Sequence, residues 1–68
     1  MKFERLSIGE NAGKIWRYLN ANPDSSMTKI CEGTGLKKDE VLLAIGWLFR
    51  EEKLEGEKKS GSYVLNIL

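Results

Sequence analysis

The chain has 68 residues, and its 11 Lys and Arg against 10 Asp and Glu give a formal net charge of +1. A chain of this length buries only roughly 60% of the surface that its unfolded form exposes, so residues 1–68 have room for a single small domain. With 41% hydrophobic residues, the chain is too apolar to stay disordered. The near-neutral charge lacks the basic surplus that is typical of a nucleic-acid-binding domain.

The cysteine and histidine content excludes several kinds of site. One Cys and no His leave no tetrahedral zinc set and no Cys–His or Ser–His pair for nucleophilic catalysis. We therefore expect no catalytic residue, no metal and no cofactor, and no small-molecule ligand is evident. The longest apolar run, Val41 to Phe49, falls well short of the ~20 residues of a membrane span, and the first residues lack the apolar core of a signal peptide. A cytoplasmic protein without a membrane partner is expected.

A first helix is expected to begin at Ser7 and to end before Pro23. Ser7 and Glu10 have the spacing of a capping box. Proline ends the helix because it lacks a backbone N–H and pushes the preceding residue out of helical geometry. Trp16 and Tyr18 flank the apolar face, and we expect Trp16 to lie in the core. The inward residues, which recur at helical spacing, are Ile8, Ala12, Ile15 and Leu19.

Two further helices are predicted on either side of a tight glycine turn. Ser25-Ser26 offers the N-cap of a short helix, and Gly33-Thr34-Gly35 ends it. A third helix is expected from about Lys38 to Glu51. The inward residues are Met27, Ile30 and Cys31 in the short helix and Val41, Ala44, Ile45 and Leu48 in the third. This order of elements is the skeleton of a helix-turn-helix.

The end of the chain changes to the period of a strand. A turn at Ser60-Gly61 pairs Lys59 with Ser62 and continues to a pair between Leu54 and Ile67. This register places Leu54, Tyr63, Leu65 and Ile67 on one face and Glu55, Glu57, Val64 and Asn66 on the other. A hairpin alone is marginally stable, so it must pack on the helices. The predicted fold is therefore α+β, a winged helix-turn-helix with three helices followed by a C-terminal β-hairpin wing.

From Met27 to Leu54 the chain resembles the helix-turn-helix core of winged-helix proteins. The matching residues are Ile30-Cys31, Gly35-Leu36 at the turn, and Val41, Ala44-Ile45 and Leu48 in the recognition helix. More narrowly, the chain looks like a family of small, stand-alone prokaryotic winged-helix proteins of uncharacterised function, through Ala12-Gly13-Lys14-Ile15-Trp16, Gly35-Leu36-Lys37, Ala44-Ile45-Gly46-Trp47-Leu48 and Arg50-Glu51-Glu52-Lys53. Lys37 replaces the usual Ser or Thr cap, and Glu52 replaces the usual helix-ending glycine. The boundaries of the third helix are therefore predicted only to within a residue or two at these ends.

The resemblance implies a DNA-binding, transcription-related role. In helix-turn-helix proteins the start of the third helix meets base edges, and nearby cations neutralise phosphates. Asp39 and Glu40 stand at this start, where their simplest role is to favour the positive end of the helix dipole. From Met27 to Leu68, seven Lys and Arg balance seven Asp and Glu, a mixture typical of an ordinary solvated surface. The candidate contacts with duplex DNA are Lys37, Lys38, Arg50, Lys58 and Lys59.

The outward face of the third helix is apolar where a DNA reader is polar. Glycine inside a helix costs about 1 kcal/mol relative to alanine, so we expect another backbone or ring to approach Gly46 closely. One interpretation is that Met1 to Leu6 folds back over this face through Phe3 and Leu6. The other is a protein interface, most simply a symmetric homodimer, formed by Leu42, Leu43, Gly46 and Trp47.

Two functions thus remain open for this non-catalytic domain. One is DNA binding, and the alternative is a protein–protein interaction module that uses the outward face of the third helix. A third, intermediate option is a dimer that binds nucleic acid with one wing from each copy.

Overall fold

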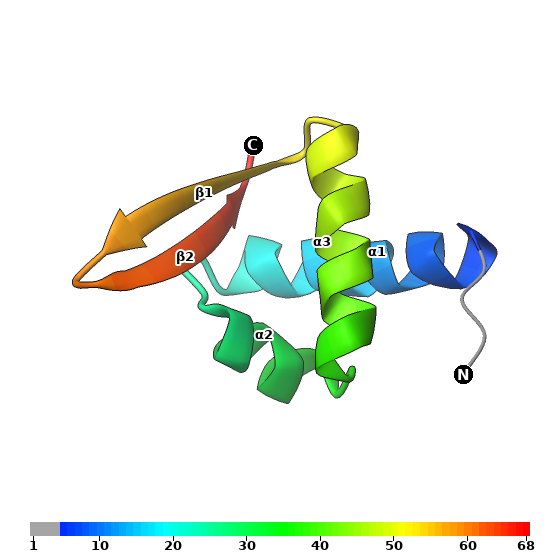
Figure 1. Cartoon of the computed structure of the whole chain (residues 1–68), viewed down its shortest axis with the longest axis horizontal. Helices are drawn as coiled ribbons and strands as arrows, with labels where there is room; N and C mark the ends of the chain where they lie inside the picture. Colours follow the sequence, from blue (N-terminus) through cyan, green and yellow to red (C-terminus); the bar gives the residue numbers. More distant parts are fainter. Residues whose placement is uncertain (1–4) are drawn as a thin grey trace.

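The computed structural model describes residues 5–68 and contains three helices followed by one hairpin (Figure 1). The helices are α1 (Arg5–Ala21), α2 (Met27–Thr34) and α3 (Lys38–Arg50). Strands β1 (Leu54–Lys59) and β2 (Ser62–Ile67) form an antiparallel sheet. Helix α3 crosses α1, and the hairpin projects away from the helices. The predicted α+β winged helix-turn-helix is confirmed.

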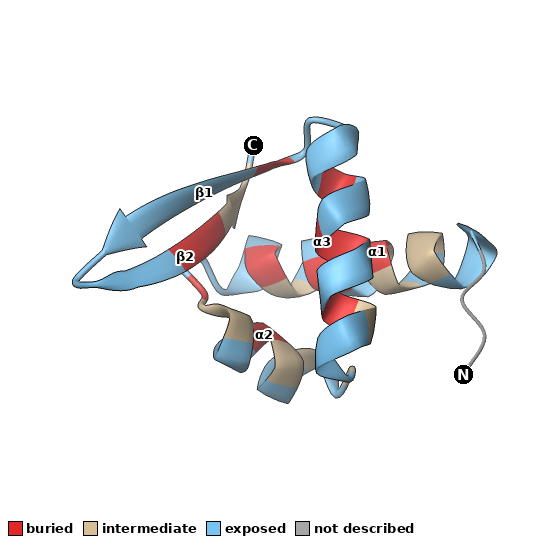
Figure 2. Cartoon of the chain, in the orientation of Figure 1, coloured by how far each residue is buried: buried red, intermediate tan, exposed pale blue. Residues whose placement is uncertain are grey.

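The core gathers the inward faces of all these elements (Figure 2). The helical spacing of apolar residues predicted most of its members correctly, although Ile8 is only half-buried. The prediction that Trp16 lies in the core is wrong, because its side chain is 37% exposed. Trp16 follows the buried Ile15, and one step along a helix turns a side chain by about 100° away from the core. The buried cluster consists of Ala12, Ile15, Leu19, Ile30, Val41, Ala44, Ile45, Leu48, Leu54 and Leu65.

The start of α1 differs from the prediction, whereas its end agrees. The helix already includes Arg5, so Ser7 lies within it and is not the N-cap. Arg5 and Leu6 are good helix formers, and nothing between them and Ser7 interrupts the helix. At the other end, the backbone N–H of Asn22 donates to the carbonyl of Tyr18 at 2.8 Å, one residue before Pro23.

Glycine is required at two positions near the end of α2. Gly35 has φ +75° and its N–H donates to the Cys31 carbonyl at 2.9 Å, a left-handed cap that ends α2. At Gly33 the Tyr18 ring occupies the space that a Cβ would need. The close approach that we expected at Gly46 is not made by any of residues 5–68, since none of their atoms lies within 4 Å of its Cβ position.

Helix α3 ends in a Schellman motif, although the sequence has no glycine there. The N–H of Glu52 donates to the Phe49 carbonyl at 3.0 Å, and the N–H of Lys53 donates to the Leu48 carbonyl at 2.9 Å. Glu52 takes the left-handed conformation itself, with φ +56°. The motif therefore forms as it would with glycine, but with the steric cost of a side chain.

The hairpin has the predicted register, from Leu54 opposite Ile67 to Lys59 opposite Ser62. Ser60 and Gly61 both have positive φ, of 50° and 82°, as a type I′ turn requires. The predicted faces are partly wrong, because Val64 is buried and Tyr63 is 71% exposed. Strand β2 is the inner strand, with β1 on one side and a bridge to Ser25 on the other. Tyr63 lies near the projecting tip, opposite Lys58.

Candidate nucleic-acid and protein interface

The first turn of α3 carries two exposed lysines beside two carboxylates that serve the helix itself. Lys37 is the N-cap residue, and its N–H donates to Glu40 Oε1 at 3.0 Å. Asp39 Oδ1 accepts from the Glu40 N–H at 3.1 Å. Both carboxylates thus stabilise the start of the helix, as expected from their place at the positive end of the helix dipole. Lys37 and Lys38 remain exposed to solvent.

The two wing lysines differ in how they are held. Lys59 Nζ lies 2.9 Å from Asp24 Oδ2 and 3.3 Å from Glu57 Oε1, so its charge is partly balanced within the chain. The hydrogen bonds that Lys59 donates to Asp24 and Glu57 raise the pKa of Lys59 above its ordinary value. Lys58 Nζ instead lies 5.9 Å from the centroid of the exposed Tyr63 ring. Lys58 is therefore the wing cation that is better placed to meet a phosphate.

A polar clasp fixes the wing to the loop between α1 and α2. The N–H of Asp24 donates to Asn66 Oδ1, and Asn66 Nδ2 donates to Asp24 Oδ1, both at 2.7 Å. These contacts with Asn66, followed by those with Lys59, lower the pKa of Asp24. Ser25 adds a backbone bridge to β2, with the Leu65 N–H donating to its carbonyl at 2.8 Å. No local pattern in the sequence indicates this clasp, because its partners are far apart in the chain.

The five predicted DNA contacts are not gathered into one cluster. Lys37 and Lys38 lie at the start of α3, whereas Arg50 lies at its other end, about 18 Å away at the rise of an α-helix. Lys58 and Lys59 lie at the tip of the hairpin, well separated from α3 (Figure 1). The structure thus offers two separate cationic ends, with Arg50 apart from both.

The predicted apolar face of α3 is exposed. Leu42 and Leu43 are 49% and 40% exposed, and Gly46 faces open space. Phe49, which is not among the residues predicted for this face, is also exposed and lies against Gly56 of β1. Phe49 directly follows the inward residue Leu48, and an apolar residue at this position was the sequence signal that could have placed it on the surface of α3.

The predicted cover from Met1 to Leu6 is tested only at its last two residues, because residues 1–4 lie outside the described part of the chain. Leu6 is 74% exposed and so covers little, whereas Phe3 lies outside the described residues. Trp47 is partly shielded by α1 instead, since its Cζ2 lies 3.9 Å from the Cβ position of Gly9.

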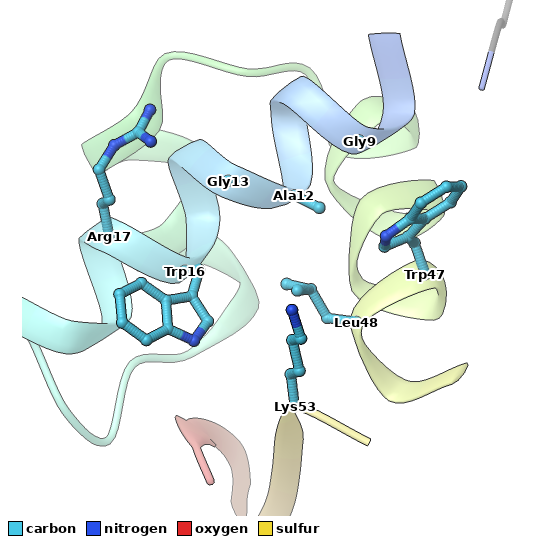
Figure 3. Close-up of a pocket in the computed structure, with 8 residues that line it drawn as sticks. All are labelled: Gly9, Ala12, Gly13, Trp16, Arg17, Trp47, Leu48 and Lys53. Carbon is cyan, nitrogen blue, oxygen red and sulfur yellow. The ribbon is translucent and has the colours of Figure 1, made fainter. Parts of the chain in front are cut away.

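A groove of about 480 Å³ separates α1 from α3 on the Trp47 side. Figure 3 shows Trp16 and Trp47 on opposite sides of it, with the Lys53 side chain reaching up between them. Gly9 and Gly13, one turn apart on α1, leave the space open. Among the described residues no carboxylate lines the groove, and those that do line it are Gly9, Ala12, Gly13, Trp16, Arg17, Trp47, Leu48 and Lys53.

Over residues 5–68, no group of three or more His, Cys, Asp and Glu side chains could hold a metal ion. None of the helices in that range is long and apolar enough to cross a membrane. Cys31 is half-buried and packs against the core.

The helix-turn-helix, the wing and the bridge at Ser25 define a winged-helix domain. Residues 1–67 match the family described as Winged helix-turn-helix domain (DUF2582), and the chain belongs to that family. It is 37% identical over 62 residues to the uncharacterised protein MJ1608 of Methanocaldococcus jannaschii, covering 88% of this chain and 89% of that protein. The predicted resemblance to small, uncharacterised winged-helix proteins is confirmed.

Two solved structures share the fold. Protein BT2368 from Bacteroides thetaiotaomicron, solved by NMR, superimposes with a TM-score of 0.85 at 32% identity, covering 96% of this chain and 79% of that chain. The Zα domain of PKZ from Carassius auratus, crystallised in complex with Z-DNA, superimposes with a TM-score of 0.77 and covers 91% and 98% of the two chains. At 19% identity, the second similarity shows the fold alone.

Proposed function

We propose that this protein binds duplex DNA through the start of α3 and the tip of the wing. The observation that carries the proposal is the exposure of Lys37 and Lys38 at one projecting end and of Lys58 at another, while the acidic neighbours Asp39 and Glu40 are occupied with the helix backbone. The Zα domain, which has the same fold, was crystallised with Z-DNA. The expected role is non-catalytic, transcription-related and cytoplasmic.

The proposed contacts are electrostatic rather than base-specific. The lysines would meet phosphates, whereas the outward face of α3 offers Leu42, Leu43 and Gly46, which make no hydrogen bonds to base edges. Lys59 contributes less than Lys58, because Asp24 and Glu57 already balance its charge. Arg50 lies at the far end of α3 and is the least well placed of the five candidates. We therefore expect weak discrimination between DNA sequences.

A titration of a fluorescently labelled duplex, followed by anisotropy at two salt concentrations, tests the proposal. Phosphate contacts from the four lysines Lys37, Lys38, Lys58 and Lys59 predict a fall in affinity on the order of 100-fold between 50 and 200 mM salt. Absence of binding at the lower salt concentration would contradict the proposal.

The exposure of an apolar surface on α3 favours a second candidate function, self-association. Leu42, Leu43, Gly46 and Trp47 would form the interface of a homodimer, since such surfaces on small soluble proteins commonly mark interaction sites. The dimer is compatible with DNA binding if each copy supplies one wing. In sedimentation velocity at high micromolar concentration, the wild-type protein is expected to be a dimer and the variant Leu43→Glu a monomer. A wild-type monomer under these conditions excludes self-association.

A further inference from the structure

One row of exposed residues runs along the outward side of α3 with the spacing of a helix–helix contact. Asp39, Leu43, Gly46 and Arg50 follow one another at steps of four, three and four residues, and all are exposed. At 100° per residue they lie within an arc of about 60°, opposite the buried Val41. The outward row, as we call these four residues, is therefore a continuous stripe that nothing in the described chain covers.

The outward row is complementary to itself when two copies of α3 run antiparallel. In such a pair the numbers of two facing residues always add up to the same total. Both pairs of the outward row add up to 89. Asp39 then faces the partner's Arg50, and Leu43 faces the partner's Gly46. Both pairs centre on the same point between Ala44 and Ile45, so one two-fold axis serves the whole row.

We propose that a second copy of this chain packs on α3 in this antiparallel register. The inference rests on the second candidate function above and gives it a geometry. None of the described residues has an atom within 4 Å of the Cβ position of Gly46, so within residues 5–68 an approaching leucine side chain meets no obstruction there. The proposal thus explains a glycine that costs about 1 kcal/mol in a helix interior and that intrachain packing does not require.

Charge decides between the antiparallel and the parallel arrangement. Antiparallel packing places the carboxylate of Asp39 beside the partner's Arg50 at both ends of the contact, whereas parallel packing in register brings like charges together. Among residues 5–68, neither Asp39 nor Arg50 forms an ion pair within its own chain. Leu42 and Phe49 border the row on the side of the wing, and Trp47 borders it on the side of α1.

The arrangement gives Arg50 a role in place of DNA contact. It also covers the outward face of α3, so that DNA would be met by the start of α3 and by the two wings. The domain would then recognise a second copy with the surface that other helix-turn-helix proteins insert into the major groove.

A charge exchange tests the register by sedimentation velocity. Asp39→Arg places arginine opposite the partner's Arg50, and Arg50→Asp places two carboxylates together, so each is expected to weaken dimerisation by about tenfold or more. The double variant restores both pairs and is expected to recover the dimer. Glu55→Arg changes the net charge as Asp39→Arg does, but on β1, and should leave the dimer unchanged. Circular dichroism verifies that each variant is folded.

Disulfide cross-linking gives a second measurement that does not depend on the double variant. On a Cys31→Ser background, Asp39→Cys and Arg50→Cys are prepared separately. Equivalent positions lie about 16 Å apart along the helix axis in the proposed dimer, too far for a disulfide. A cross-linked species is therefore expected only after the two variants are mixed.

The outcomes separate failure of the register from failure of self-association. Recovery in the double variant, or cross-linking only in the mixture, supports the proposal. Suppose that Leu43→Glu dissociates the dimer, but that the double variant does not recover it and the mixture does not cross-link. This result overturns the register and keeps the second candidate function. A wild-type protein that is monomeric overturns both.

Discussion

Asp24 Oδ2 lies 2.9 Å from Lys59 Nζ and thereby connects the loop after α1 to the tip of the wing. The same carboxylate accepts a hydrogen bond from Asn66, and this bond and the contact with Lys59 both lower its pKa. The orientation of the wing thus depends on a charged group that also neutralises one of the candidate DNA contacts.

Acidification is expected to loosen this clasp. Because the pKa of Asp24 is lower in the folded than in the unfolded chain, its contribution to stability is present above the unfolded pKa and is lost as the pH falls through the folded value. Asp24→Asn keeps a residue that tolerates the local φ of +57° and removes the titrating group. Thermal melts across the acidic range should fall more steeply for the wild-type protein than for Asp24→Asn; equal slopes would refute the assignment.

Neutralising Lys58 should weaken DNA binding more than neutralising Lys59. Lys58→Gln removes a cation with no carboxylate partner among the described residues and should lower the slope of log affinity against log salt by about one. Lys59→Gln removes a charge that Asp24 and Glu57 already balance, so a smaller change is expected. Anisotropy titrations at several salt concentrations measure both slopes, and a larger effect from Lys59→Gln would be inconsistent with the clasp.

Glu52→Gly is expected to stabilise the protein. Glu52 holds φ +56° at the end of α3, a conformation that costs a side-chain-bearing residue about 1 kcal/mol relative to glycine. A gain of this size raises the melting temperature by about 4–8 °C in a domain this small. Glu51 has φ −85°, so Glu51→Gly serves as the control and should give no gain.

Gly33→Ala should destabilise the protein by about 1–3 kcal/mol, because the added methyl group meets the Tyr18 ring. Gly13→Ala is the matched control, since its methyl would contact only the flexible end of Arg17, at 3.6 Å. The control is expected to be neutral or slightly stabilising, as alanine is the better helix former. Urea denaturation measures both, and a Gly33→Ala variant as stable as the wild type would show that Tyr18 can move aside.

The sequence predicted what depends on local periodicity. The inward row of α3 and the hairpin register follow from helical spacing and from the turn at Ser60-Gly61, and both agree with the structure. The clasp between Asp24 and Asn66 depends on tertiary placement, as does the bridge between Ser25 and Leu65. No local pattern encodes these contacts, because their partners lie about 40 residues apart.

The candidate site was predictable as a set of residues but not as an arrangement. The positions of Lys37 and Lys38 on α3 followed from the helix boundaries. That Lys59 pairs with Asp24, and that the groove opens between Trp16 and Trp47, required the packing of separate elements.

The most direct test of DNA binding by the start of α3 compares the affinities of two double variants for a labelled DNA duplex. The test variant is Lys37→Gln/Lys38→Gln, and the control variant is Lys14→Gln/Arg17→Gln. The control removes the same charge from α1, outside the proposed interface. The first variant is expected to lose at least about tenfold in affinity, with the salt slope lowered by about two, while the control stays near the wild-type value. Equal losses in the two variants would contradict a site at the start of α3.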